Sequence, residues 1–166
     1  MLRDFFNQRL YIQLSPQRVK VRDPRSGREV DEVPEIAVQR PPTGKASVLA
    51  VGSQARSATA QAGATLHNPF AHPRSLVSDF TLADQVLKAF ARRVVGGGMR
   101  FVPNPIVIVH PLGEHAGGLT QVEIRALREL ALGLGASGAK VWQGPPLTDK
   151  QLLSGELPGT GSVLDA

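Results

Sequence analysis

Residues 44–47, with the sequence GKAS, are the part of this chain most similar to a phosphate-binding loop. In such loops, backbone N–H groups and a lysine surround the phosphates. The pattern needs another glycine five positions before Gly44 and a Ser or Thr directly after Lys45. Gln39 and Ala46 occupy those two positions here. We therefore interpret the run as a Pro/Gly-rich loop with a solvated lysine.

His110, Glu114 and His115 carry imidazole and carboxylate groups of the kinds that zinc binds. The Pro-Leu-Gly of residues 111–113 does not place the two histidines on one helical face, and no further ligand converges with them in the sequence. We predict no metal site and interpret the segment as a loop at a strand end. A Ser/His/Asp triad stays open, because its members converge only in the fold.

The composition is that of one ordinary globular domain. The 166 residues are 42% hydrophobic and 20% charged, close to the average for soluble proteins. The absence of cysteine excludes disulfides, thiolate metal sites and cysteine nucleophiles. No apolar run reaches the roughly 18 residues of a membrane span, and residues 1–10 are too polar for a secretory signal, so we expect a cytoplasmic protein.

The net charge of +5 arises mainly early in the chain. Residues 1–60 hold ten Lys and Arg against six Asp and Glu, whereas residues 61–166 hold nine against eight. The early basic residues are interleaved with acidic ones, and a single Tyr and a single Trp leave little for base stacking. We therefore predict no nucleic-acid partner.

Short β-prone stretches predict most of the sheet. Three of them, separated by turn residues, predict an antiparallel meander: residues 11–14, 18–23 and 29–33. The β-branched run of residues 106–109 predicts a strand buried on both faces, and residues 139–142 predict another. Residues 35–39 and 47–51 are also expected to be extended, whereas residues 53–73 show no period and are interpreted as an irregular surface segment.

Apolar residues at helical spacing predict two helices. The first is expected to have a capping box at Thr81 and Asp84 and to end at Gly96, and the second to have a capping box at Thr120 and Glu123. With the strands, this order predicts an α/β domain with a mixed five-stranded sheet, a meander plus two parallel strands, and helices packed on it.

Four segments keep a recognisable order and spacing along the chain: AVGSQAR at residues 50–56, HPRSLVSDF at 72–80, PIVIVHP at 105–111 and TQVEIRALRE at 120–129. Together they resemble successive landmarks of the MreB family, the actin-like cell-shape proteins. The resemblance implies RNase H-like topology and a family architecture of two domains with nucleotide bound between them. It assigns a first domain to residues 10–146, with an amphipathic segment at 1–9 and a tail at 147–166 that ends where a second domain would begin.

The resemblance implies a phosphate loop after the first strand, and that loop is altered here. The family has Asp-Leu-Gly-Thr where this chain has Gln13, Leu14, Ser15 and Pro16. Gln13 lacks a metal-binding charge, Ser15 adds a side chain where phosphate approaches, and Pro16 has no N–H. The family's hydrolytic acid lies in a Glu-Glu-Pro near residues 143–145, which are Gln-Gly-Pro here. We therefore predict no cofactor, no metal and no catalytic residue.

Two apolar segments are candidates for contacts with other molecules. Members of the family begin with short membrane-binding segments, so one candidate is the N-terminal set Leu2, Arg3, Phe5, Phe6 and Arg9. The alternative is that Phe5 and Phe6 cover the sheet or a neighbour. The tail is expected to cover apolar surface, on its own domain or by exchange within a homo-oligomer, through Leu152, Leu153, Leu157, Val163 and Leu164.

These observations favour a non-enzymatic MreB-like interaction module, a pseudo-ATPase of the cytoskeleton. It would associate with itself or with a cytoskeletal or cell-envelope partner, in the cytoplasm or at the inner face of the membrane. The alternative is a nucleotide-dependent actin-like protein completed by a second chain. A remnant without a retained role also stays open.

Overall fold

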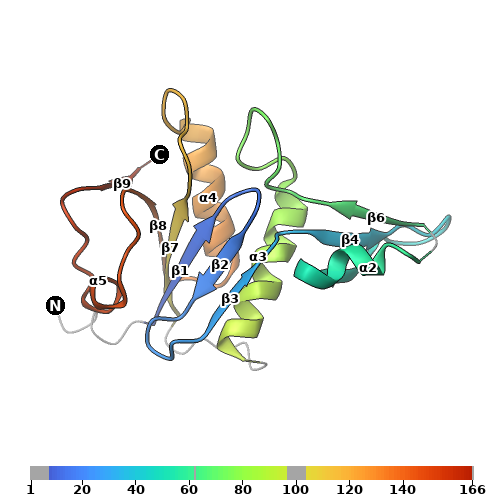
Figure 1. Ribbon diagram of the computed structural model, residues 1–166, viewed down its shortest axis with the longest axis horizontal. Coiled ribbons are helices and arrows are strands. Elements are labelled where there is room, and N and C mark those ends of the chain that lie inside the picture. The colour runs from blue at the N-terminus through green and yellow to red at the C-terminus, as the bar shows by residue number, and fades with distance from the viewer. Residues whose placement is uncertain (1–7, 62, 97–103, 166) are drawn as a thin grey trace.

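A six-stranded mixed sheet forms the centre of the molecule (Figure 1). The computed structural model describes residues 8–61, 63–96 and 104–165. Across the sheet the strands are β3 (Glu29–Glu32), β2 (Val19–Arg22), β1 (Arg9–Leu14), β7 (Ile106–Pro111), β8 (Gly138–Gln143) and β9 (Ser162–Leu164). The predicted meander and the two predicted parallel strands are confirmed. The sixth strand, β9, was not expected in this sheet; it pairs antiparallel with β8.

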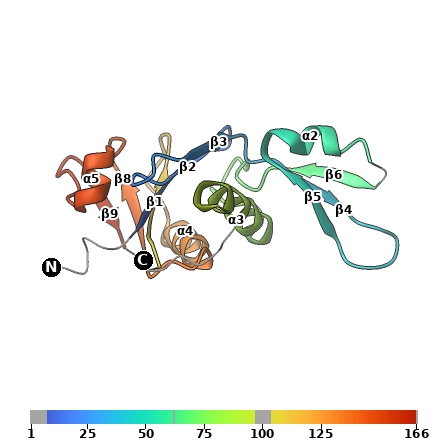
Figure 2. The same cartoon turned by 90° about the horizontal axis from the view of Figure 1, so that it is seen from below.

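Two long helices cover one face of this sheet, as Figure 2 shows from below. They are α3 (Phe80–Val95) and α4 (Gln121–Gly133). Alternation along the strands aims every second residue at them, so Leu10, Ile12 and Val109 join Leu87 and Phe90 in one buried core. The remaining members of that core come mostly from the same strands and helices.

One predicted helix start is correct and the other is wrong. Thr120 and Glu123 form the expected capping box of α4. At α3 the cap is instead Asp79, whose carboxylate accepts a hydrogen bond of 2.9 Å from the Leu82 amide. Asp79 has the extended backbone of an N-cap, so the helix begins before the predicted cap at Thr81.

On the opposite face, β1, β7 and β8 are covered by residues 144–161, which we call the strap. Within it, α5 (Asp149–Ser154) begins at a capping box between Thr148 and Gln151 and ends at Gly155. Beneath it Tyr11, Ile108 and Trp142 are buried. The prediction that residues 106–109 are buried on both faces is therefore confirmed for Val107 to Val109.

A separate three-stranded sheet extends to one side (Figure 1). Its order is β5 (Ser47–Val51), β4 (Ile36–Gln39) and β6 (Ala64–His67), with a 3-10 turn at Gly52–Gln54 and α2 (Ala55–Ala58). The two expected extended segments are thus strands. The prediction of irregular structure over residues 53–73 is wrong for Ala55–Ala58 and Ala64–His67, because four-residue pieces are too short to show a period.

Arg93 of α3 joins the two sheets. Its guanidinium pairs with the Glu32 carboxylate at 3.2 Å and donates to the Val51 carbonyl at 2.7 Å. Glu32 also accepts from the Ser53 amide at 2.8 Å. Burial by itself would raise the pKa of Glu32, but the Ser53 hydrogen bond and the Arg93 charge outweigh it and lower that pKa. Gly52 has a φ of +85°, and a Cβ there would overlap the Glu32 carboxylate.

Candidate functional site

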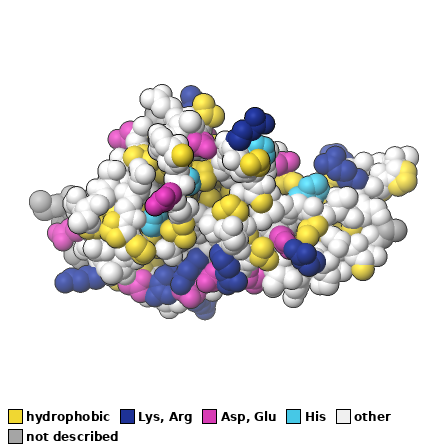
Figure 3. All heavy atoms as spheres, turned by 45° about the horizontal axis from the view of Figure 1, so that its top comes forward, with side chains coloured by type: hydrophobic (Ala, Val, Ile, Leu, Met, Phe, Trp, Pro, Cys, Tyr) yellow, Lys and Arg dark blue, Asp and Glu magenta, His cyan; other side chains and the backbone are white. Residues whose placement is uncertain are grey.

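Two neighbouring pockets lie where β1, β7 and β8 end. This is the edge of an α/β sheet at which ligands usually bind. The larger pocket, about 780 Å³, lies among the β1–β2 turn, residues 72–76 and the loop that follows β7. The smaller, about 220 Å³, lies between the ends of β7 and β8. Figure 3 turns this end of the molecule toward the viewer, and the loops around it form a surface of mixed polar and apolar side chains.

The β1–β2 turn contains Ser15 and Pro16, two of the altered phosphate-loop residues. Its amide donors are mostly engaged: the Ser15 N–H donates to the Arg18 carbonyl at 2.9 Å, and the Arg18 N–H donates to Ser15 Oγ at 3.1 Å. Pro16 has no N–H, and its carbonyl accepts from Asn68 at 2.8 Å. Among the hydrogen bonds of the described residues, only the Gln17 amide of this turn stays unused. One free donor is a poor phosphate cradle.

Gln13, the third altered position, belongs to a buried polar network beneath the strap. The Tyr11 hydroxyl lies 2.6 Å from His110 Nδ1 and accepts a hydrogen bond of 3.2 Å from the Leu147 amide. The Gln13 side chain also hydrogen-bonds Tyr11. Because Leu147 already donates to the hydroxyl, we assign the hydroxyl proton to the bond with Nδ1, which makes Nδ1 the acceptor of a neutral imidazole.

Burial controls the protonation of both rings in this network. It raises the pKa of Tyr11, although hydrogen bonds from Leu147 and Gln13 oppose it. His110 is only 4% exposed, and this burial lowers its pKa. A hydrogen bond with the Gly144 backbone has the opposite effect but is smaller. Both rings are therefore neutral near pH 7.

The three residues considered for zinc take different roles. His110 is buried in the polar network, Glu114 is exposed, and His115 lines both pockets. In the described part of the chain, His115 Nε2 is buried without a hydrogen-bond partner. No group of three or more His, Cys, Asp or Glu side chains is gathered as for a metal ion anywhere in those residues.

The end of β8, where the family's hydrolytic acid is expected, is shaped around Trp142. The indole N–H donates to the Pro145 carbonyl at 2.9 Å, and a Cβ on Gly144 would lie 2.7 Å from the indole ring. Gln143 lines the smaller pocket, which has no acidic side chain among its described residues. In the larger pocket Glu123 is engaged by the Thr120 cap and by the Leu76 amide at 3.2 Å.

The predicted membrane-contact set is only partly visible. Leu2, Arg3, Phe5 and Phe6 lie outside the described residues. The assignment of Arg9 to that set is wrong, because its side chain is 7% exposed and donates to the Leu153 carbonyl at 2.7 Å. A guanidinium that is buried and bonded to the strap does not lie in a headgroup layer. No described helix has the length and apolar character needed to cross a membrane.

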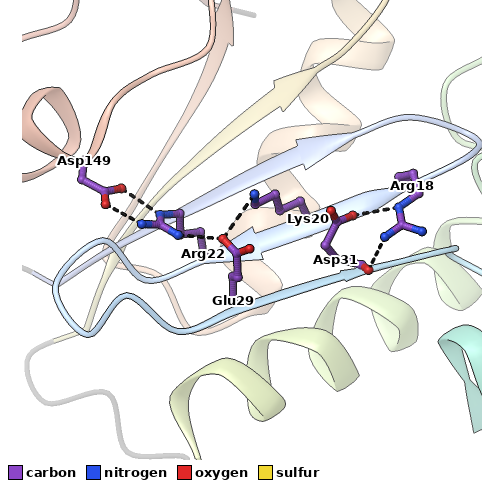
Figure 4. A network of polar contacts seen from close by, with 6 residues as sticks. All are labelled: Arg18, Lys20, Arg22, Glu29, Asp31 and Asp149. Carbon is purple, nitrogen blue, oxygen red and sulfur yellow. Dashed lines mark hydrogen bonds and ion pairs between the residues drawn. The ribbon is translucent and has the colours of Figure 1, made fainter.

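A line of charged side chains crosses β2 and β3 and reaches the strap (Figure 4). Arg22 donates two hydrogen bonds, of 2.8 and 2.5 Å, to Asp149 and pairs with Glu29 at 2.6 Å. Lys20 pairs with Glu29 at 3.2 Å, and Arg18 with Asp31 at 2.9 Å. The hydrogen bonds from Arg22 lower the pKa of Asp149. Asp149 thereby fixes the start of α5 to β2.

The tail residues proposed for an interface divide into two groups. Leu152 is fully buried and Leu157 packs against the same cluster on the inner side of the strap, while Leu164 packs against the helix-side core. Leu153 and Val163 are 42% and 37% exposed. The tail thus covers its own domain, as one of the two expected arrangements. Leu152 is not available for contact with another molecule in this arrangement, which corrects that part of the predicted interface.

Comparison with known proteins confirms the resemblance to MreB. No protein-family model matches the chain. The cell shape-determining protein MreB of Haemophilus influenzae is 28% identical over 137 residues, which are 81% of this chain and 37% of that protein. The chain therefore spans less than two fifths of the length of this curated relative.

Solved structures show the same fold. MreB5 of Spiroplasma citri bound to AMPPNP matches with a TM-score of 0.64 and 20% identity, covering 82% of this chain and 38% of that one. The ADP-bound structure of the same protein matches with a TM-score of 0.63. The described domain thus has the actin-like fold of part of MreB.

Proposed function

We propose that this chain is an MreB-like interaction module that neither binds nor hydrolyses nucleotide. It associates with itself or with a cytoskeletal or cell-envelope partner. The MreB5 structures hold AMPPNP and ADP, whereas we propose that this chain binds no nucleotide. The related fold in this chain has lost the chemistry with which a nucleotide would be held.

The β1–β2 turn is the observation that carries the proposal. It uses its Ser15 and Arg18 amides internally and has Pro16 in place of a third donor. The position of the family's metal-binding acid is Gln13, which is uncharged and bonded to Tyr11. A phosphate bound at this turn would find one free amide, and Gln13 offers no carboxylate to hold its Mg²⁺.

Exposed apolar side chains outside the pockets support a role in association. Val122 of α4 is 79% exposed, and Phe80, at the start of α3, is 45% exposed. Leu153 and Val163 add two such positions on the strap and on β9. Exposed apolar side chains of this size often mark contact surfaces when they are grouped. The tail interface and the membrane-contact segment remain part of this proposal.

Calorimetric titration of the full chain with Mg²⁺–ATP tests the proposal. We expect no binding tighter than the millimolar range, or about −4 kcal/mol. MreB5 of Spiroplasma citri titrated with AMPPNP is the positive control, and sedimentation of the same samples reports self-association. Micromolar ATP binding by this chain would overturn the proposal and favour the alternative, a nucleotide-dependent protein completed by a second chain.

A further inference from the structure

The strap is a closed loop whose two ends meet over a single ring. A Cβ on Gly144 would lie 2.8 Å from Gly161 Cα, so the backbones at the two ends are in contact. A Cβ on either glycine would also overlap the Trp142 indole. Trp142 is 1% exposed, and its N–H holds the strap at Pro145. A compact loop with its ends together can open locally while the sheet stays folded.

Three polar contacts attach the middle of the strap to the sheet. Arg9 donates to the Leu153 carbonyl, and Arg22 pairs with Asp149 at the surface. The third attachment is buried: the Leu147 amide donates to the Tyr11 hydroxyl, which in turn donates to His110. Among the three, this buried contact alone continues to a group that changes charge between pH 5 and 7.

We propose that the strap is a latch, held shut by neutral His110 through Tyr11 and opened when His110 is protonated. In the closed state it covers the apolar face formed by Tyr11, Ile108 and Trp142. In the open state that face becomes accessible. This device concerns the strap alone and does not depend on the proposal about nucleotide.

Protonation would remove the acceptor on which the latch depends. A doubly protonated imidazole has N–H groups at both nitrogens, so Nδ1 can no longer accept from Tyr11. The hydroxyl, which already accepts from Leu147 and Gln13, would then face a further donor. The groups that face His110 are Tyr11 from β1, the Gly144 backbone from the strap and, across the smaller pocket, His115 from the loop after β7.

None of those facing groups is a carboxylate that would stabilise an imidazolium. The acidic residue of α5, Asp149, is paired with Arg22 instead. A buried cation without a partner is costly, whereas a cation exposed by opening is solvated. Protonation therefore favours the open state over the closed one.

The pH range in which the strap should open follows from the coupling between opening and the protonation of His110. The pKa of His110 lies below its ordinary 6.5 in the closed state and returns toward it on opening. Closure is therefore complete above about pH 6.5 and is lost as the pH falls from there toward the lowered pKa. The opening constant should rise by up to about tenfold per pH unit in that interval. Carboxylates titrate mostly below about pH 4.5, so they do not contribute to it.

Trp142 provides a direct measurement, because it is the one tryptophan of the chain. We expect acrylamide quenching of its fluorescence, and amide exchange across residues 147–154 after correction for intrinsic rates, to increase between pH 7.5 and 5. In His110→Gln, whose amide stays neutral and can still accept from Tyr11, both should become independent of pH. His67→Gln, on β6 of the separate sheet, is the matched control and should keep the wild-type profile.

A second variant keeps the test decisive if His110→Gln does not fold. Gln13→Asp places a carboxylate beside His110, its register partner on β7. It should stabilise protonated His110 in the closed state, so that opening at low pH becomes weaker than in the wild type. Equal pH profiles in the wild type and in His110→Gln would overturn the latch. So would an unchanged Trp142 signal between pH 7.5 and 5, or a Gln13→Asp variant that opens at low pH as much as the wild type does.

Discussion

The two faces of the central sheet are buried in different ways. On one face, α3 and α4 lie along the strands and form a continuous apolar core with Leu10, Ile12 and Val109. On the other, Leu147 and Leu152 of the strap pack with Tyr11, Ile108 and Trp142 of the sheet, and the strap is attached by a few polar contacts.

The same strands contribute to both faces, so this difference comes from what covers them. The helices bury extended apolar stripes, which stabilise in proportion to area. The strap has a six-residue helix and glycines at its ends, and its hydrogen bonds each contribute about 1 kcal/mol. Regions with few buried apolar contacts open locally before the whole domain unfolds. The helix face should therefore determine global stability, and the strap face local opening.

The largest expected loss of stability is on the helix face. Phe90 of α3 is fully buried, and Phe90→Ala should lower the free energy of unfolding by about 3–5 kcal/mol, because it removes ring contacts and leaves a cavity. Denaturant titration followed by circular dichroism measures it. Phe80→Ala, on the same helix but 45% exposed, is the matched control and should change stability by roughly 0.5 kcal/mol or less. Equal losses in the two variants would contradict this account of the helix face.

An intermediate effect is expected on the strap face. Leu152 is also fully buried, and Leu152→Ala should cost about 2–3 kcal/mol, at the lower end for a core leucine. The loss should appear first in amide exchange across residues 147–154, since the strap can open without unfolding the sheet. Leu153→Ala, next to it and 42% exposed, should leave exchange nearly unchanged. If Leu152→Ala lowers global stability as much as Phe90→Ala does, the two faces are not distinct.

The smallest effect is expected at the surface end of the strap. Arg22→Met removes the pairs with Asp149 and Glu29, but these side chains are 28%, 41% and 37% exposed. Solvent screening should limit the loss to about 1 kcal/mol or less, and salt should reduce it further.

The pH dependence of this pair gives a separate check. The pKa of Asp149 is lowered from an ordinary 3.8, so its contribution is present above that pH and is lost as the pH falls through the lowered value. Thermal denaturation of the wild type and of Arg22→Met should therefore differ at pH 7 and converge near pH 2. A difference that persists in strong acid would show that Arg22 acts through packing.

Local signals in the sequence were sufficient for much of the fold. The capping box of Thr120 and Glu123 and the β-branched run at residues 106–109 each depend on neighbours in the chain. The first helix was placed correctly but its cap was not, because Asp79, Thr81 and Asp84 all carry capping side chains. Only the backbone conformation distinguishes among them.

The altered phosphate loop was also apparent from residue types alone. Pro16 lacks an N–H in any fold, and Gln13 is uncharged in any fold. Only the tertiary structure shows which hydrogen bonds the residues at these positions make. The Ser15 and Arg18 amides close the turn, and Gln13 joins Tyr11 and His110 from a strand nearly one hundred residues away in the chain.

The sequence by itself determined the mixed sheet, its two long helices, the resemblance to MreB and the residue types of the β1–β2 turn. The separate sheet, the sixth strand and the strap were decided by tertiary contacts, because their helices and strands are three to six residues long and carry little periodicity. Arg9 shows why. Its position near apolar residues suggested a membrane surface, but its burial and its bond to Leu153, 144 residues later, exist only in the folded chain.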